Sequence, residues 1–259
     1  MCKTTIDNNI LMIALDFPPC KSAGVQRTLK FCQYLPQYHW QPYVLTSYPL
    51  IYNELDSNVD IDVPLSKKIY RAFGLNVHKH MTIGGKYIDS FAQPDIYSTW
   101  YYHAVIKGKS IIKDIAPDVI WSTHPCLTAH KIAAKLKRYS GLPWIADYRD
   151  PFKGHSNSIY HNDSGKAIDK QTIYESDIVV FATTEMKDLY IDSYPQVNSE
   201  KFIVIENGYN DDFFDEFATS LCMGNNKKSN ILRIIHSGEL YEQGRNPTNL
   251  FLAISNSMI

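Results

Sequence analysis

The sequence predicts an α/β fold, with a Rossmann-like parallel sheet covered by helices on both faces and an incomplete second Rossmann-like domain after it. Short apolar runs bounded by turn residues alternate with segments of helical period along most of the 259 residues. The predicted strands are apolar throughout rather than alternating with polar residues, as in parallel sheets that are buried on both faces. Repeated strand–helix–strand order is typical of α/β proteins.

The first predicted unit contains the most informative turn of the chain. Residues 10–15 (ILMIAL) are predicted to form an apolar strand. A Pro-Pro turn and the small residues Ser22-Ala23-Gly24 follow this strand, and a helix is expected over residues 25–35. Backbone N–H groups and the positive end of a helix dipole both favour an anion at such a turn. The unit therefore predicts a phosphate site at Gly24, for a nucleotide or a phosphorylated sugar. The alternative is that Gly24 only lets the helix approach the sheet.

The remaining elements continue the alternation, apart from residues 50–93, which we interpret as an insertion or mobile region that contains one strand. Further strands are predicted over residues 42–46, 68–71, 118–122, 143–146, 178–182, 202–206 and 231–236. Further helices are predicted over residues 97–114, 127–139, 167–175, 185–193 and 246–255.

The sequence predicts two domains and a linker. Residues 1–218 form the first domain, residues 219–230 (TSLCMGNNKKSN) are a polar linker, and residues 231–259 hold one strand and one helix. A lone strand–helix unit cannot complete a parallel sheet. We therefore interpret it as the start of a truncated second domain, and the alternative is that its strand joins the first sheet.

Composition limits the classes of function. The net charge of -1 argues against a protein that binds nucleic acid by bulk attraction. Five scattered cysteines without CxxC spacing argue against a disulfide framework and a zinc site, and no metal or other cofactor is expected. No signal peptide or membrane-spanning run is recognised, so the predicted location is cytoplasmic.

Polar residues follow two predicted strands at their carboxyl ends, where open α/β sheets bind ligands. His124 follows one strand and would face the same crevice as Gly24. Its imidazole could bind a sugar hydroxyl or move a proton, or it could simply cap the next helix. Asp147, Arg149 and Asp150 follow the next strand, where they could form a structural network or contact substrate hydroxyls.

A second turn of small residues occurs near the end of the chain, at Gly238, with Arg245 before the last predicted helix. Because cations are unfavourable at a helix N-terminus, Arg245 favours an anionic partner such as a diphosphate, although exposed arginines are common there. A nicotinamide site is not favoured, since the strand over residues 42–46 has no carboxylate at its end.

Six segments together resemble family 4 glycosyltransferases of the GT-B fold, in the bacterial branch that builds surface polysaccharides. The segments are DFPPCKSAGVQRTLKFCQYLPQYHWQPYVLT (16–46), PDVIWSTHPCLTAHKIAAKLK (117–137), GLPWIADYRDPF (141–152), ESDIVVFATTEMKDLY (175–190), KFIVIENGYNDDFF (201–214) and IIHSGELYEQGRNP (234–247). They occur in the family's order and cover most of the chain except residues 50–93.

The resemblance implies that a sugar is transferred, with retention of configuration, from a nucleotide-sugar donor to a saccharide or lipid-linked acceptor. It implies that no metal is bound, and it is compatible with peripheral contact at the inner face of the cell membrane. It places Gly24, Gly238 and Arg245 at the donor phosphates, His124 beside the transferred sugar as the catalytic residue, and the group Asp147, Arg149 and Asp150 near the acceptor.

The resemblance also shows where this chain departs from the family. The family's second domain continues further and carries an acidic motif that holds the donor, and Glu239 stands where many members have a basic residue. We therefore expect the chain alone to be inactive or nearly so. The alternatives are a non-catalytic Rossmann-like binding module or remnant that needs a partner and, less favoured, a sugar-nucleotide epimerase.

Overall fold

A computed structural model describes residues 8–56, 68–152, 163–208, 234–236, 240 and 246–257. The chain divides into two compact units, Met1–Asn207 and Gly208–Ile259. The predicted domain boundary at residue 218 and the linker over residues 219–230 lie outside the described residues.

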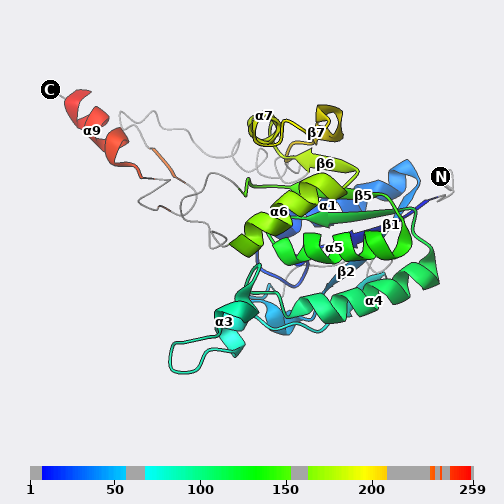
Figure 1. Ribbon diagram of the computed structural model, residues 1–259. Coiled ribbons are helices and arrows are strands. Elements are labelled where there is room, and N and C mark those ends of the chain that lie inside the picture. The colour runs from blue at the N-terminus through cyan, green and yellow to red at the C-terminus, as the bar shows by residue number, and fades with distance from the viewer. Residues whose placement is uncertain are drawn as a thin grey trace, which may run out of the picture. The chain divides into compact units, whose positions relative to one another are not determined.

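The first unit is built on a parallel sheet whose described strands lie in the order β3-β2-β1-β4-β5-β6-β7 (Figure 1). All neighbouring strands are paired in parallel. This confirms the predicted fold class and the first seven predicted strands to within about two residues. The strands are β1 (Asn8–Ile13), β2 (Trp40–Ser47), β3 (Ile69–Ala72), β4 (Val119–Thr123), β5 (Trp144–Tyr148), β6 (Ile178–Phe181) and β7 (Phe202–Val204).

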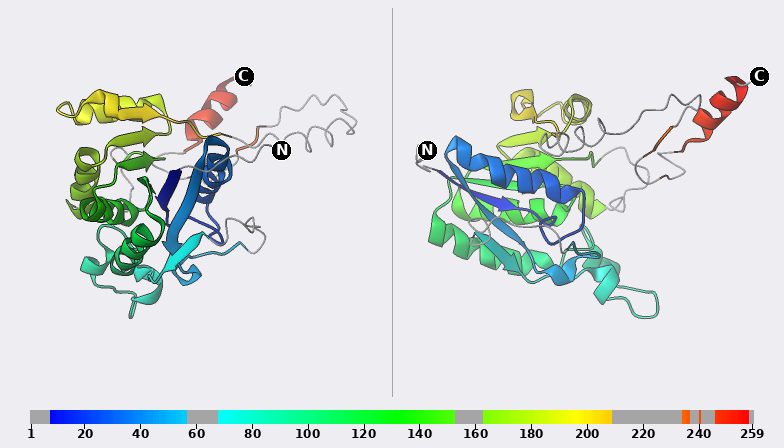
Figure 2. Two further views of the ribbon diagram at one scale, coloured as in Figure 1. Left: turned by 90° about the vertical axis from the view of Figure 1, so that its right-hand side faces the viewer. Right: turned by 180° about the vertical axis from the view of Figure 1, so that it is seen from behind.

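Helices cover both faces of this sheet, as Figure 2 shows for α1 on one side and the green helices on the other. The two faces of β1 illustrate the reason, because Ile10 and Met12 pack with α1 while Leu11 and Ile13 pack with α4 and α5. Both faces are apolar and buried, which explains the unbroken apolar runs. The described α-helices of this unit are α1 (Gly24–Tyr34), α3 (Val77–His80), α4 (Trp100–Ile115), α5 (Leu127–Ser140), α6 (Asp163–Glu175) and α7 (Thr184–Ser193).

Helix ends follow local sequence signals. The Thr183 side chain accepts a hydrogen bond from the backbone N–H of Met186 and so caps the start of α7. Helix α5 ends at Gly141, whose φ of 74° lies in the left-handed region that favours glycine. Among the described helices, none combines the length and apolar character needed to cross a membrane.

The irregular segment 50–93 contains the edge strand β3 and several short helical turns. These turns are η2 (Pro49–Ile51), α3 and η3 (Asp89–Ala92). Tyr52 ties the segment to the rest of the unit, because its hydroxyl donates to the carbonyl oxygen of Leu15 at 2.8 Å. Two further 3-10 turns, η1 (Leu35–Tyr38) and η4 (Ser199–Lys201), precede β2 and β7.

The second unit is described only in part. The predicted last helix is present as α9 (Thr248–Ser257). Of the strand predicted over residues 231–236, residues 231–233 lie outside the described part, and residues 234–236 have no regular secondary structure.

Candidate functional site

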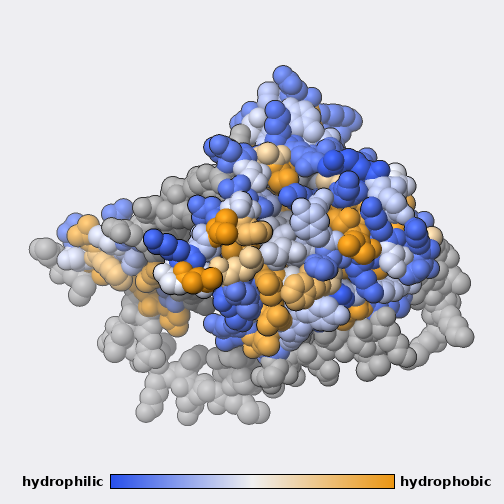
Figure 3. Space-filling view, turned by 60° about the horizontal axis from the view of Figure 1, so that its bottom comes forward, coloured by the Kyte–Doolittle hydropathy of each residue, from blue (hydrophilic) through white to orange (hydrophobic). Residues whose placement is uncertain are grey.

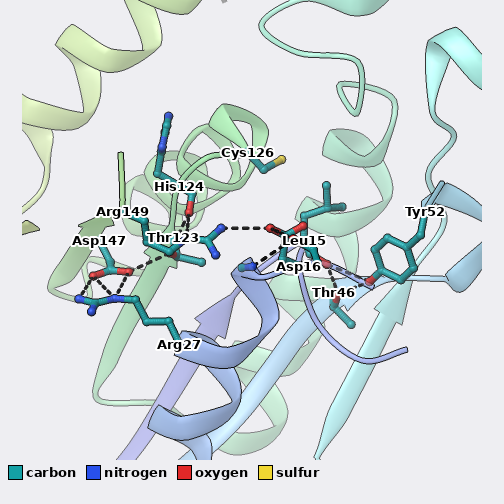
Figure 4. Close-up of polar contacts among 12 residues, drawn as sticks. Leu15, Asp16, Arg27, Thr46, Tyr52, Thr123, His124, Cys126, Asp147 and Arg149 are labelled. Carbon is teal, nitrogen blue, oxygen red and sulfur yellow. Dashed lines mark hydrogen bonds and ion pairs between the residues drawn. The ribbon is translucent and has the colours of Figure 1, made fainter. Parts of the chain in front are cut away.

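The sheet has a switch point between β1 and β4. From β1 the chain proceeds to β2 and β3 on one side, whereas β4 to β7 lie on the other side. At such a switch the loops leave the carboxyl ends of the two central strands in opposite directions, and the crevice between them is where open α/β sheets bind ligands. The loops after β1, β4 and β5 meet here (Figure 4).

An ion pair between Asp16 and Arg149 joins the loops after β1 and β5. The Nη2 atom of Arg149 donates to Oδ2 of Asp16 at 3.1 Å, and the two side chains are 10% and 18% exposed. The Nε atom of Arg149 donates to the backbone carbonyl oxygen of His124. Ser22 also donates to Asp16, at 3.4 Å. Arg149 therefore connects three loops at the switch point.

Gly24 lies directly against this ion pair, at the first residue of α1. A Cβ atom at position 24 would be 2.1 Å from Nη1 of Arg149 and 2.2 Å from Oδ2 of Asp16. Glycine thus allows the ion pair to approach the helix closely, and any side chain here would require Arg149 and Asp16 to move. The Asp16 carboxylate occupies the N-terminal end of α1, where the helix dipole favours an anion. A contact between Gly24 and a donor phosphate stays a prediction.

His124 contacts Arg149 through its backbone carbonyl and not through its imidazole ring. Its backbone carbonyl faces Arg149, while its imidazole points away from the guanidinium (Figure 4). The ring is buried and stacks on Tyr148, with centroids 5.5 Å apart, and lies 6.3 Å from His130. Burial, then the neighbouring His130 and Arg149, lowers the pKa of His124 well below its usual value. The imidazole is therefore neutral at pH 7.

Asp147 is held by Arg27 and not by Arg149, so the structure does not bring the three predicted acceptor residues into one network. The Nη2 atom of Arg27 donates to Oδ1 of Asp147 at 2.8 Å, and its Nε lies 3.1 Å from Oδ2. Thr123 donates to the same carboxylate at 2.8 Å. The Asp147 side chain is fully buried and that of Arg27 is 7% exposed. Asp147 is accordingly part of the scaffold, whereas Asp150 is exposed at the same edge.

Arg27 also fixes the chain where it leaves β7. Its Nη2 donates to the carbonyl oxygen of Ile205 at 2.8 Å, and its Nη1 donates to the carbonyl oxygen of Glu206 and to Oδ1 of Asn207. One side chain on α1 thus links β5 and the segment after β7.

Sequence reasoning missed Asp16, Arg27 and Asp95. Arg27 carried a signal, because it is a cation in the first turn of a helix, where cations are unfavourable unless a carboxylate compensates. The sequence contains no local signal for Asp95, because its partner lies 33 residues further along the chain. The carboxylate of Asp95 accepts a hydrogen bond from the backbone N–H of Thr128 at 2.7 Å. Asp95 therefore caps α5, the role that His124 was considered for. Burial raises the pKa of Asp95.

Two predicted donor residues, Gly238 and Arg245, lie outside the described residues. Within the described part of the chain, no three His, Cys, Asp or Glu side chains are grouped so that they could hold a metal ion.

The described edge of the sheet presents three charged groups, which are the ion-paired guanidinium of Arg149, the carboxylate of Asp16 and the exposed carboxylate of Asp150. Such groups suit hydroxyls, which donate to carboxylates, and phosphates, which accept from guanidinium groups.

Comparison of the fold with solved structures gives several matches at low sequence identity. Sucrose-phosphate synthase from Thermosynechococcus elongatus matches with a TM-score of 0.59 and 13% identity, over 85% of this chain and 54% of that one. HepE from Anabaena, solved with UDP, matches with a TM-score of 0.50 and 12% identity, over 84% and 51%. CalG4, the calicheamicin glycosyltransferase, matches with a TM-score of 0.50 and 9% identity, over 78% and 53%.

The chain spans about half the length of these structures. No protein-family model matches the sequence, and no curated protein matches it. At these identities the likeness concerns the fold. The seven-stranded described sheet with its flanking helices is a Rossmann-like α/β fold, and this chain shares that fold with the matched structures.

Proposed function

We propose that this chain forms the acceptor side of a retaining glycosyltransferase, which transfers a sugar from a nucleotide-sugar to a saccharide or lipid-linked acceptor in surface polysaccharide synthesis. The observation that carries the proposal is the meeting of Arg149, Asp16 and Gly24 at the switch point between β1 and β4. The resemblance of the six segments and the fold of the matched structures support it.

The proposal gives the residues separate roles. Arg149, partly exposed and held in place by Asp16 and the His124 carbonyl, contacts a phosphate or hydroxyl of the substrates. Asp150, exposed at the same edge, binds acceptor hydroxyls. Asp147 acts only by positioning, because its carboxylate is buried and held by Arg27 and Thr123. Gly238 and Arg245 grip the donor diphosphate from the second domain.

His124 is proposed to contact the transferred sugar, and the structure allows this role to be separated from a scaffold role. Arg149 is held by the backbone carbonyl of His124, so a change of the side chain leaves that contact in place. With a complementing donor domain present, we expect His124→Gln to reduce transfer while the affinity for UDP stays within about twofold. If the variant transfers sugar as fast as the wild type, the imidazole has no part in the reaction.

Calorimetric titration with UDP and UDP-glucose tests the proposed contact between Arg149 and a substrate phosphate. We expect saturable binding that Arg149→Lys weakens by about tenfold, because a point charge replaces a planar group that makes contacts in two directions. Arg138→Lys is a matched control, since Arg138 pairs with Glu175 on the surface of α5 and is 54% exposed. Equal binding by both variants, or no binding of any nucleotide-sugar, would contradict the proposal.

Transfer activity provides the second measurement. Because the matched structures are about twice as long as this chain, we expect little or no transfer by the 259 residues alone. Binding without transfer, even in the presence of a complementing donor domain, would favour a non-catalytic binding module instead.

A further inference from the structure

A short hairpin follows α3 and is exposed over ten consecutive residues, 82–91. The backbone N–H of Ile83 donates to the carbonyl oxygen of Lys86 at 2.8 Å, and the N–H of Lys86 donates back at 3.1 Å. Gly84 and Gly85 form the turn between them with φ angles of 58° and 77°. Two successive residues with positive φ form the tight turn that matches the twist of a hairpin. We call residues 82–91 the apolar hairpin.

The apolar hairpin presents large hydrophobic side chains to solvent. Ile83 at the turn is 87% exposed, Ile88 is 64% exposed, and Tyr87 and Phe91 are also exposed. Single exposed apolar residues are ordinary, but several on one projecting turn indicate an interaction surface. Figure 3 shows hydrophobic side chains grouped among hydrophilic ones on this side of the molecule.

Basic residues flank these apolar side chains. His78, Lys79 and Lys86 lie in or beside the hairpin, against one carboxylate at Asp89. The start of α4 adjoins it, because the Ser98 hydroxyl donates to the carbonyl oxygen of Phe91. The outward face of α4 continues the same composition. Its exposed residues include Tyr102, His103, Ile106, Lys107 and Lys113, with Asp114 at the end. This surface is positive although the whole chain has a net charge of -1.

The base of the hairpin is fixed to the candidate site. The Nζ atom of Lys79 donates to the carbonyl oxygen of Tyr52 at 2.9 Å, and the Tyr52 hydroxyl donates to the carbonyl oxygen of Leu15, which precedes Asp16. The hairpin also follows β3 at its carboxyl end, the edge of the sheet that carries the site. Whatever the hairpin binds is therefore held beside that edge.

We propose that the apolar hairpin inserts into the interfacial layer of a membrane with anionic headgroups, with Lys86 and the lysines of α4 at the lipid phosphates. An apolar tip with basic flanks has the chemistry of interfacial membrane anchors. A stable protein partner would instead need about 800 Å² of well-packed surface, and charged residues are depleted at the core of such interfaces. The inference does not depend on the proposed glycosyltransferase function.

Vesicle sedimentation with the full chain tests this inference. We expect the chain to bind vesicles of equal parts phosphatidylcholine and phosphatidylglycerol, and not vesicles of phosphatidylcholine alone. The double change Ile83→Asp and Ile88→Asp lowers binding by about tenfold or more, because it removes the inserted apolar area. Lys86→Glu lowers it by about fivefold, and salt weakens binding by the wild type.

Matched controls are available in the same chain. Ile235→Asp changes an isoleucine that is also 87% exposed, and Lys170→Glu changes an exposed lysine on α6; both leave binding unchanged. As a second measurement, tryptophan fluorescence of Ile83→Trp shifts to the blue only with the anionic vesicles. Because the changed residues are exposed, the urea midpoint stays at the wild-type value.

Three results would overturn the inference. The wild type fails to bind anionic vesicles at low salt, or the double aspartate variant binds as tightly as Ile235→Asp. The third is a concentration-dependent dimer, without lipid, that the aspartate changes dissociate, which would assign the hairpin to a second copy of the chain. None of these results bears on nucleotide-sugar binding, so the two proposals fail separately.

Discussion

Gly24 illustrates at the residue scale how one missing side chain allows a charged site to form. A methyl group at this position would overlap the guanidinium of Arg149 and the carboxylate of Asp16. We expect Gly24→Ala to cost roughly 1–3 kcal/mol of unfolding free energy, because the ion pair must move to admit the methyl group. Urea unfolding measures the cost, with Gly208→Ala as a control, since a Cβ there would meet nothing within 4 Å. An unchanged midpoint for Gly24→Ala would show that the pair can shift freely.

His130 predicts a pH dependence of stability. It is buried between Tyr148 and Trp144, and its Nδ1 lies 2.7 Å from the Ser122 hydroxyl. Burial, and then Arg149, lowers its pKa from 6.5 to about 3. Above pH 6.5 the histidine is neutral in both states, whereas below it only the unfolded chain takes up the proton. Stability is therefore lost as the pH falls from about 6.5 towards 3, at ~1.4 kcal/mol per pH unit.

The variant His130→Gln isolates this contribution. Between pH 6.5 and pH 5, the wild type should lose roughly 2 kcal/mol more unfolding free energy than the variant. His124 acts in the same direction because its pKa is lowered too, and Asp95 acts in the opposite direction because its pKa is raised; both residues are present in both proteins. Parallel pH profiles of the urea midpoint for the two proteins would mean that His130 titrates normally in the fold.

Arg27 acts at the scale of elements, since it holds β5 and the end of β7 from a position on α1. Removing it as Arg27→Ala leaves the carboxylate of Asp147 buried without its partner, which costs about 3–5 kcal/mol. Arg138→Ala breaks an exposed pair with Glu175 and should cost less than ~1 kcal/mol. Hydrogen exchange of the amides of residues 205–207 should accelerate only in Arg27→Ala. Similar unfolding costs for the two variants would show that Arg27 and Asp147 gain little from each other.

The same element shows what the sequence could predict and what it could not. Strand β1 and helix α1 follow from local apolar runs, and the strand ends correctly placed Gly24, His124 and Arg149 at one edge of the sheet. Arg27 and Asp147 are 120 residues apart, and no local pattern reports that they meet. The loop that holds His124 was predictable from the sequence, but the direction of its ring depends on Tyr148 and His130, which pack against it only in the folded sheet.

At the scale of the whole molecule, the first compact unit should fold by itself. Residues 1–207 contain every strand of the described sheet, both hydrophobic core clusters and the Arg27 contacts to residues 205–207. Cooperative unfolding depends on such a complete core. We expect a chain that ends at Asn207 to unfold in one transition, with a urea midpoint close to that of the same unit in the full chain. A chain that ends at residue 201 lacks β7 and the partners of Arg27 at residues 205–207, so its midpoint should be markedly lower. If residues 1–207 give no cooperative transition while the full chain does, the core of the sheet requires residues from the second unit.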